Sequence, residues 1–336
     1  MKVLVTGGTG YIGSHTTVAL FEAGHTPILV DNFSNSTPDV IETLRDMTSP
    51  NLIFYEGDVS DIAFLQKIWD AEKPEAVIHF AAKKAVGESV AEPLLYYRTN
   101  LGSLQTVLET MQQNHCDKLV FSSSCTVYGE PDVCPVNEDT PQKTAESPYG
   151  ATKQMSERII EDASKAIPLH AIALRYFNPV GAHPSSKIGE LPLGVPNNLI
   201  PFLTQATAGL RDKLTVHGDD YDTPDGTCMR DFIHVMDLAE AHVAAVEFLA
   251  STEASFTVLN IGSGSGNSVQ ELIDTFEKTN NVKVPYKIGP RRNGDVVKIW
   301  ADASKAKELL GWQTTRSLED SMRDAWNWQV ALSKKA

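Results

Sequence analysis

Tyr149 and Lys153 lie four residues apart and could together perform proton transfer. On a helix this spacing puts both side chains on one face. Ser147 and Pro148 are residue types favoured at the start of a helix, so we predict that one begins here. An ammonium beside a phenol lowers a pKa that is ordinarily about 10, which would make Tyr149 a base near neutral pH. The spacing alone is a weak signal, because it also occurs on solvated helix faces.

Three serines supply a candidate partner for that base. Ser122, Ser123 and Ser124 follow an apolar run typical of a strand. If the strand ends at the ligand-binding edge of a sheet, Ser124 can donate to the same substrate oxygen as Tyr149. Ser122 and Ser123 are adequately described as a serine-rich turn.

A glycine pattern near the start predicts a dinucleotide site. Gly7, Gly10 and Gly13 follow a short apolar run and open a predicted helix over 11–23, which ends at Gly24. Glycines at these places allow a tight turn and close approach of a pyrophosphate to the helix N-terminus. An ordinary strand-to-helix turn is the alternative for such a pattern taken alone.

Two aspartates follow later predicted strands. Asp31 comes 18 residues after Gly13, where a carboxylate accepts hydrogen bonds from both ribose hydroxyls and repels a 2′-phosphate. NAD is therefore favoured over NADP. Asp58 occupies the next strand end and could hold the adenine amino group, although a helix cap before Asp61 is the alternative.

These residues require a parallel sheet to bring them together. Short apolar or β-branched runs occur at 3–6, 27–30, 52–55, 76–80, 118–121 and 170–175, with helix-length segments between them. Strands apolar on both faces that alternate with helices indicate a doubly wound α/β domain. Beyond about residue 180 the sequence becomes rich in loops, but the helical pattern at 237–249 and the apolar run at 257–261 suit a return to the first sheet.

Composition excludes several classes of function. The 336 residues carry 29 basic and 43 acidic side chains, a net charge of −14 that disfavours nucleic acid and anionic membranes as partners. Cys116, Cys125, Cys134 and Cys228 form neither a disulfide framework nor a zinc-binding pattern, so we expect reduced thiols, no metal and a cytoplasmic location. His79 lies within an apolar run and is expected to be a satisfied core residue.

Four further stretches of sequence help to identify a protein family. They add to the glycine turn, Asp31, Ser124 and the Tyr149–Lys153 pair. They are VIHFAA at 77–82, KAVGES at 84–89, LRYFNPVGAHP at 174–184 and RDFIHVMD at 230–237. With these stretches the sequence resembles the UDP-glucose 4-epimerase family of the extended short-chain dehydrogenase/reductases, over residues 1–330. The resemblance implies a Rossmann-type NAD-binding domain at 1–180, to which about 235–262 returns, and a smaller mixed α/β UDP-sugar-binding domain at 181–336.

The resemblance also implies an activity and its catalytic residues. The family interconverts UDP-galactose and UDP-glucose reversibly: tightly bound NAD oxidises C4 to a transient 4-keto sugar, which is then reduced on its opposite face. Tyr149 would take the proton of the 4-hydroxyl, Ser124 would assist at the same oxygen, and Lys153 would tune Tyr149. Helix-length segments at 93–114 and 149–165 resemble those through which family members form homodimers.

Ligand contacts carried over from the family fall into two sets. The cofactor set is Gly7, Gly10, Tyr11, Ile12, Gly13, Asp31, Asn32, Phe33, Ser34, Asn35, Ser36, Asp58, Val59, Phe80, Ala81, Ala82, Lys84, Tyr149, Lys153 and Phe177. The substrate set is Lys84, Ser124, Tyr149, Asn178, Asn198, Leu199, Thr215, Val216, His217, Arg230, Arg292, Asp295 and Ile299. Within it, Arg230 and Arg292 would neutralise the diphosphate through charge-assisted hydrogen bonds.

Three positions depart from the family pattern. His217 stands where phenylalanine is common beside uracil, and Cys228 stands where glycine is usual. Ile299 occupies a position that is tyrosine in glucose-restricted members and small in members that accept N-acetylhexosamines. We therefore expect weak activity on UDP-N-acetylhexosamines.

Two other functions remain to be weighed. A nucleotide-sugar 4,6-dehydratase would carry an Asp-Glu pair after its catalytic threonine, but Ser124 is followed by Cys125 and Thr126. A non-catalytic NAD-binding sensor could use the same fold, because fold alone does not establish catalysis. Such a sensor would have no need of Ser124, Tyr149 and Lys153 together.

Overall fold

Seven parallel strands form the main sheet of the computed structural model, which describes residues 1–292 and 294–335, so that Asn293 and Ala336 lie outside the described residues. In order across the sheet these strands are β11 (Phe256–Ile261), β6 (His170–Tyr176), β5 (Lys118–Ser124), β4 (Ala76–His79), β1 (Lys2–Thr6), β2 (Thr26–Asp31) and β3 (Ile53–Glu56). The order reverses between β4 and β1, and in doubly wound sheets ligands bind at the carboxyl ends of the strands beside such a reversal.

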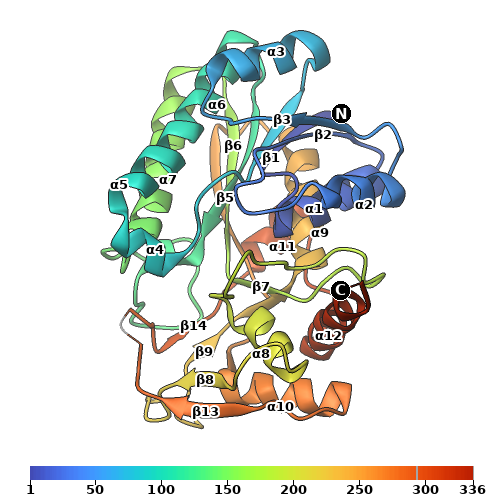
Figure 1. The fold of residues 1–336 in the computed structure, drawn as a ribbon. Helices are drawn as coiled ribbons and strands as arrows, with labels where there is room; N and C mark the ends of the chain where they lie inside the picture. Colours follow the sequence, from blue (N-terminus) through green and yellow to red (C-terminus); the bar gives the residue numbers. More distant parts are fainter. Residues whose placement is uncertain (293, 336) are drawn as a thin grey trace.

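Helices cover both faces of this sheet (Figure 1). They are α1 (Tyr11–Glu22), α2 (Asp39–Met47), α9 (Val235–Leu249) and α11 (Ser304–Leu310) on one face, and α3 (Ile62–Glu72), α6 (Gly102–Gln113) and α7 (Pro148–Ala166) on the other. Alternate residues of β1 explain the two layers: Val3 and Val5 pack with α1 and α9, whereas Leu4 packs with α3 and α6. Because both faces are buried, the central residues of β1, β2 and β4 are apolar on both sides, as is usual in parallel strands.

The strands expected from the sequence are confirmed to within a few residues. The largest difference is in β5, which continues through Ser124, so Ser122 and Ser123 belong to a strand and the expectation of a serine-rich turn is wrong. Their backbones pair with β6, and this pairing keeps the segment extended. The helix expected at 149–165 is α7, with Ser147 as its N-cap.

The segment expected to be helical at 93–114 is helical from residue 93 to residue 113, with one π turn inside the helix. After α4 (Val86–Ala91), it comprises α5 (Pro93–Tyr96), a π-helical turn (Tyr97–Leu101) and α6. Asn100 lies in the π turn and its side-chain amide bonds both the Lys83 carbonyl, at 3.0 Å, and the Thr152 hydroxyl, at 3.1 Å. The turn therefore joins the loop after β4 to α7.

A second group of elements lies at the carboxyl edge of the sheet (Figure 1). Its strands pair as β7 (Asn178–Val180) with β10 (Phe232–His234), β8 (Leu214–His217) with β13 (Tyr286–Gly289), and β9 (Met229–Arg230) with both β12 (Asn267–Ser268) and β14 (Lys298–Ile299). Its helices are α8 (Leu199–Thr207), α10 (Val269–Asn280) and α12 (Leu318–Lys335). Leu203, Phe276 and Met322 belong to a separate hydrophobic core for this group.

The fold is thus α/β, with a Rossmann-like seven-stranded sheet and smaller mixed sheets, as the sequence predicted. Strand β11 completes the main sheet beside β6, and α9 packs against α1. The division into domains at residue 180 stays a prediction. Within the described residues, no helix combines the length and apolar character that crossing a membrane requires.

Candidate active site

The glycine turn has no room for side chains. Gly7 has a φ of +70°, and a Cβ placed on Gly13 would lie 2.2 Å from the Gly7 carbonyl oxygen. Helix α1 begins directly after the turn, and in its described first turn it carries neither a capping side chain nor an acidic residue. Its first N–H groups can therefore face an anion, so the turn fits a pyrophosphate. Tyr11 and Ile12 lie half-buried at this helix start.

The carboxylate of Asp31 is held beside this turn. It accepts hydrogen bonds from the backbone N–H of Thr9 at 3.1 Å and of Phe33 at 2.9 Å. The hydroxyl of Ser36 lies 3.4 Å from it. Asn32, Ser34 and Asn35 are exposed in the loop that follows β2. Asp31 is thus fixed at a strand end, where a ribose hydroxyl pair would be bound.

Asp58 does not cap the helix that follows it. Asp61 is the N-cap of α3, accepting from the backbone N–H of Ala63 and Phe64, so that alternative is wrong. Asp58 is exposed, and one of its oxygens accepts from the Asn32 amide at 3.3 Å. Val59 next to it is buried. This arrangement leaves Asp58 beside the loop that carries the predicted adenosine contacts.

His79 is a core residue, as expected. Its Nδ1 lies 2.8 Å from the Thr6 hydroxyl, and burial lowers its pKa to about 3, so the ring is neutral at physiological pH. Phe80, Ala81 and Ala82 continue half-buried beyond the end of β4. A Cβ on Gly7 would lie 3.0 Å from the Ala81 backbone nitrogen, so this strand end lines the glycine turn.

Tyr149, Lys153 and Ser124 converge at the carboxyl ends of β4 and β5. Lys153 Nζ donates to the Ser122 carbonyl at 2.5 Å and lies 5.8 Å from the centre of the Tyr149 ring. Ser124 is near enough to the Tyr149 side chain to act on its pKa, which it lowers. Ser147 starts the helix that carries the pair by accepting from the Gly150 N–H at 3.2 Å. The sequence spacing therefore places these three side chains in one site.

The pKa values of the pair depart from their ordinary values. Burial raises the pKa of Tyr149 to about 12, although Ser124 opposes the change. Burial lowers the pKa of Lys153 to about 7, against the opposing charge of Glu157. Desolvation disfavours the charged form of each group, and the Lys153 ammonium is directed at a backbone carbonyl. The pKa of Tyr149 therefore lies above its ordinary value, and the expectation that Lys153 lowers it stays a prediction.

The basic side chains expected to bind diphosphate meet at Asp295. Arg292 makes a bidentate contact with this carboxylate, at 2.8 and 3.2 Å, and Arg230 lies 3.9 Å from it. The neighbouring Arg291 turns away to Asp220, at 2.7 Å. The structure thus brings Arg230, Arg292 and Asp295 together.

The other expected substrate residues lie around the same edge. Asn178 begins β7 and Leu199 begins α8, while Thr215, Val216 and His217 lie in β8. His217 is exposed, with Nδ1 3.4 Å from the Pro290 carbonyl. Ile299 is buried in a cluster that includes Phe177. Cys228 is also buried, and its carbonyl accepts from the Val269 N–H at 3.1 Å.

Glu190 was missed from the sequence although it contacts two expected ligand residues. Its carboxylate accepts from the Asn198 side chain at 2.6 Å and lies 3.4 Å from Lys84 Nζ. Its own carbonyl accepts from the Trp328 indole at 3.1 Å. No sequence signal marked Glu190, because its partners are 106 and 8 residues away along the chain.

Glu157 was also missed, and it is buried behind the catalytic trio. It accepts from Arg175, Ser123 and Gln142. A signal was present, since Glu157 follows Lys153 by four residues and so continues the stripe that carries Tyr149.

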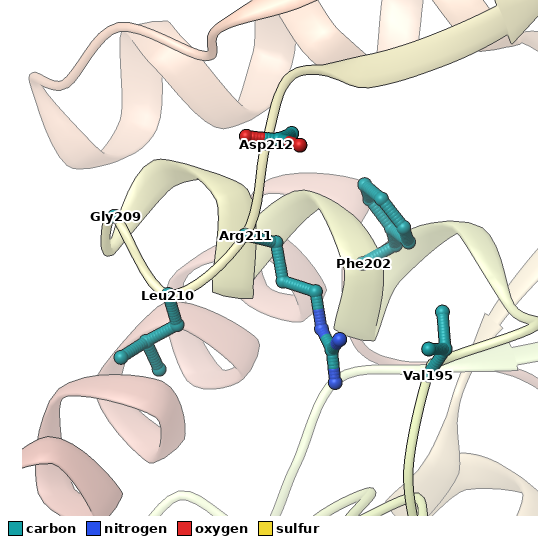
Figure 2. Close-up of a pocket in the computed structure, with 6 residues that line it drawn as sticks. All are labelled: Val195, Phe202, Gly209, Leu210, Arg211 and Asp212. Atoms are coloured by element: carbon teal, nitrogen blue, oxygen red, sulfur yellow. The ribbon is translucent and has the colours of Figure 1, made fainter.

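A surface cavity of 490 Å³ lies elsewhere, beside α8 (Figure 2). Val195, Phe202, Gly209, Leu210, Arg211 and Asp212 line it. None of them is an expected catalytic or ligand residue, so this cavity is not the candidate active site. Among the described residues, no cluster of histidine, cysteine and acidic side chains is suited to a metal ion.

A family model and curated relatives both match nearly the whole of this chain. A family model for GDP-mannose 4,6 dehydratase matches residues 4–325. The UDP-glucose 4-epimerase of Neisseria meningitidis serogroup B is 49% identical over 328 residues, which cover 97% of this chain and 96% of the relative. That of Bacillus subtilis is 48% identical, covering 98% and 97%.

Solved structures agree over the whole chain. A UDP-glucose 4-epimerase from Stenotrophomonas maltophila, with bound NAD and formylated UDP-arabinopyranose, has a TM-score of 0.97 at 46% identity, and all of both chains is covered. One from Bifidobacterium longum, in complex with NAD⁺ and UDP, has a TM-score of 0.96 at 43% identity with the same coverage. The chain therefore belongs to the UDP-glucose 4-epimerase family of the extended short-chain dehydrogenase/reductases.

Proposed function

We propose that this chain interconverts UDP-galactose and UDP-glucose by inverting C4 of the sugar through a transient 4-keto sugar, with NAD held tightly between turnovers. The observation that carries this function is the convergence of Ser124, Tyr149 and Lys153 at the same sheet edge as the glycine turn. A proton acceptor and a dinucleotide site must adjoin for an alcohol to be oxidised and reduced again in place.

The residues present suit NAD. The first turn of α1 would face the pyrophosphate, Asp31 would accept from the ribose hydroxyls, and Lys153 would contact the nicotinamide ribose. When bound, NAD supplies reversible oxidation and reduction at C4, so the overall reaction has no net redox change. Asp31 also carries the preference for NAD, because its charge repels a 2′-phosphate.

Proton transfer is assigned to Tyr149. Its phenolate oxygen takes the proton of the 4-hydroxyl while C4 becomes a ketone and returns it when C4 is reduced. Ser124 donates to the same sugar oxygen and so fixes its direction. Burial raises the pKa of Tyr149 to about 12. A positive charge beside the phenol, such as the Lys153 ammonium, would favour the phenolate that the reaction uses.

Substrate binding needs local positive charge, because the chain as a whole carries −14. Arg230 and Arg292 supply it, and their shared partner Asp295 holds them in place. A diphosphate would take up the guanidinium hydrogen bonds through its oxygens. Asn178 and Asn198 lie at the start of β7 and α8, where their amides can reach the nucleotide.

A single assay tests the activity. Purified protein is incubated with UDP-galactose and no added cofactor, the products are separated, and the absorbance of reduced nicotinamide is followed. UDP-glucose that forms without accumulating reduced cofactor supports epimerisation with retained NAD. A protein that contains NAD yet stays inert after further NAD is added would instead be a sensor, and the assignments to Tyr149 and Ser124 would be wrong.

The same family supports a homodimer and a cytoplasmic location. Apolar side chains are exposed on the elements expected to pair, with Leu94 75%, Leu95 36% and Met155 45% exposed. Burial of such a patch against a second copy would remove it from water. Light scattering after gel filtration should give twice the chain mass, and Leu94→Asp should halve it. A monomer in the unaltered protein would exclude this interface.

Ile299 supports weak activity on UDP-N-acetylglucosamine. It is 4% exposed in the cluster with Phe177, and so adjoins a residue expected to flank the cofactor. A UDP-Glc/GlcNAc 4-epimerase from Campylobacter jejuni is 39% identical over 98% of this chain. Slow conversion of UDP-N-acetylglucosamine at high enzyme concentration is expected, and its absence would refute the proposal.

A further inference from the structure

Helix α7 carries three functional groups on one stripe. Tyr149, Lys153 and Glu157 follow each other at intervals of four residues. The first two belong to the proposed mechanism, whereas Glu157 faces away from any ligand and is only 4% exposed. A buried carboxylate is costly unless it is fully hydrogen-bonded, so its presence one turn behind Lys153 needs a reason.

Glu157 has a full set of hydrogen-bond donors. Arg175 donates to both of its oxygens, through Nε at 2.9 Å and Nη2 at 2.6 Å. The Ser123 hydroxyl donates to Oε1 at 2.6 Å and the Gln142 amide to Oε2 at 3.0 Å. A bidentate pair with two further donors uses all the acceptor positions of the carboxylate. Glu157 is therefore held in one orientation.

Its partners lie directly beside the catalytic residues. Ser123 separates Ser122, whose carbonyl accepts from Lys153, and Ser124, which acts on the pKa of Tyr149. Ser123 is also paired with Arg175 across β5 and β6. The Glu157 carboxylate thus binds Ser123, which lies in β5 between Ser122 and Ser124.

We propose that Glu157 is a positioning residue for the reaction: held by Arg175, it fixes Ser123 against α7 and thereby sets Ser124, Lys153 and Tyr149 relative to one another. The proposal rests on the epimerase function above. It also gives Glu157 an electrostatic role, because its negative charge favours the ammonium form of the buried Lys153.

The charged and neutral groups around Lys153 determine how its pKa would respond to a substitution. The neutral His79 faces it from β4, and Phe121 and the Ser122 carbonyl face it from β5. Tyr149 and Glu157 flank it on α7. Further titratable groups act on Tyr149 or Glu157: Tyr96, Cys125, Arg175 and Tyr176. Within this set Glu157 is the anion, so its removal should lower the pKa of Lys153.

Variants of Glu157 and Ser123 test the proposal. Because Glu157→Gln alone would leave Arg175 buried and unpaired, the charge is removed in the double variant Glu157→Gln with Arg175→Met. This variant should lose about 10- to 100-fold in kcat and keep its KM for UDP-galactose within about twofold. Because it removes one negative and one positive charge, the pH at which it loses activity on the alkaline side should fall by less than in the single variant Glu157→Gln, where we expect a fall of about one unit. Ser123→Ala should reduce kcat by roughly threefold and leave the pH profile unchanged.

Glu161→Gln is the matched control, because Glu161 lies one further turn along α7 and forms an exposed pair with Lys165 at 2.6 Å. It should change neither kcat nor the pH profile.

If the double variant does not fold, as judged by thermal unfolding and NAD content, Glu157→Asp serves instead and should lower kcat without moving the alkaline limb. A folded variant with unchanged kcat and pH profile, or one with only KM raised, would overturn the proposal. Inactivity of the unaltered protein would refute the proposed function itself.

Discussion

The region expected to bind the cofactor and the region expected to bind the diphosphate are held in different ways. Around the glycine turn, backbone packing fixes the geometry: Gly13 lies against Gly7, and backbone N–H groups orient Asp31. Around Arg230 and Arg292, side-chain ion pairs to Asp295 fix it, and the Arg292 side chain is 58% exposed. A backbone cradle cannot rearrange without disturbing the core, whereas an exposed ion pair can exchange partners cheaply.

This contrast suits a cofactor that stays and a substrate that leaves. A preformed site loses little ordering free energy on binding and so retains its ligand. Arginines that already pair with a carboxylate must give up part of that interaction to bind a diphosphate, which limits substrate affinity and permits release. Four predictions examine this contrast.

The largest effect is expected where the two regions meet. Tyr149→Phe removes the proton acceptor but keeps the ring, so kcat should fall by about 10³-fold, within the range for loss of a general base. Bound NAD, measured after denaturation, should remain at the level of the unaltered protein. Activity within tenfold of that protein would exclude Tyr149 as the base.

A methyl group in the glycine cradle should affect the cofactor region next most strongly. In Gly13→Ala the new Cβ would meet the Gly7 carbonyl at 2.2 Å, and such overpacking costs about 1–3 kcal/mol. We expect roughly 10- to 100-fold weaker NAD binding, measured by titration of the apoprotein. Gly102→Ala is the control, since its Cβ would meet open space in α6. Equal NAD affinity in the two variants would contradict a backbone cradle.

A smaller effect, confined to the substrate, is expected at the ion pairs. Arg292→Met should raise KM for UDP-galactose about tenfold and leave NAD content unchanged, because one charged hydrogen-bonding group is worth about 1.5–3 kcal/mol and Arg230 remains. Arg291→Met is the matched control, since Arg291 pairs with Asp220 instead. A comparable rise in KM in both variants would show that general charge, not the pair at Asp295, binds the substrate.

The smallest effect concerns pH. Burial lowers the pKa of His15 and His79 to about 3 and of His242 to about 4. An unfolded histidine takes up a proton below about pH 6.5 while these folded ones do not, so stability is full above that pH and falls as the pH drops. Between pH 6 and 4, each of these histidines lowers the free energy of unfolding by about 1.4 kcal/mol for every unit that the pH falls.

His242→Leu should therefore reduce the steepness of acid destabilisation, measured by chemical unfolding at several pH values. His217→Asn is the control, because His217 is exposed. The three histidines with lowered pKa named above belong to elements of the main sheet and its helices, α1, β4 and α9. If the slope is unchanged in His242→Leu, acid sensitivity arises outside this core.

Much of the fold and of the candidate site could be predicted because short-range patterns determine them. Apolar runs gave the strands, Ser147 and Pro148 gave the start of α7, and a four-residue interval placed Tyr149 beside Lys153. Each of these follows from the period of a helix or from the apolar character of a buried parallel strand. The ligand contacts depended on family resemblance and stay predictions.

What could not be predicted depends on burial and on distant partners. The raised pKa of Tyr149 was not foreseen, because it comes from burial of the side chain, which the spacing of residues does not reveal. Glu157 was overlooked because its carboxylate is held by distant residues. These are Arg175, which is 18 residues away, and Ser123, which lies in β5. Glu190 was overlooked for the same reason, since Lys84 approaches it only in the folded chain.

The position of β11 beside β6 has a consequence for biosynthesis. Residues 177–255 must be made between these two neighbouring strands, so the main sheet stays incomplete until the ribosome has released about three quarters of the chain. Until then the backbone groups on the outer edge of β6 have no strand partner and can pair with other chains. A nascent chain that stalls before β11 should therefore be prone to aggregation and chaperone-dependent, even though its NAD-binding turn is already complete.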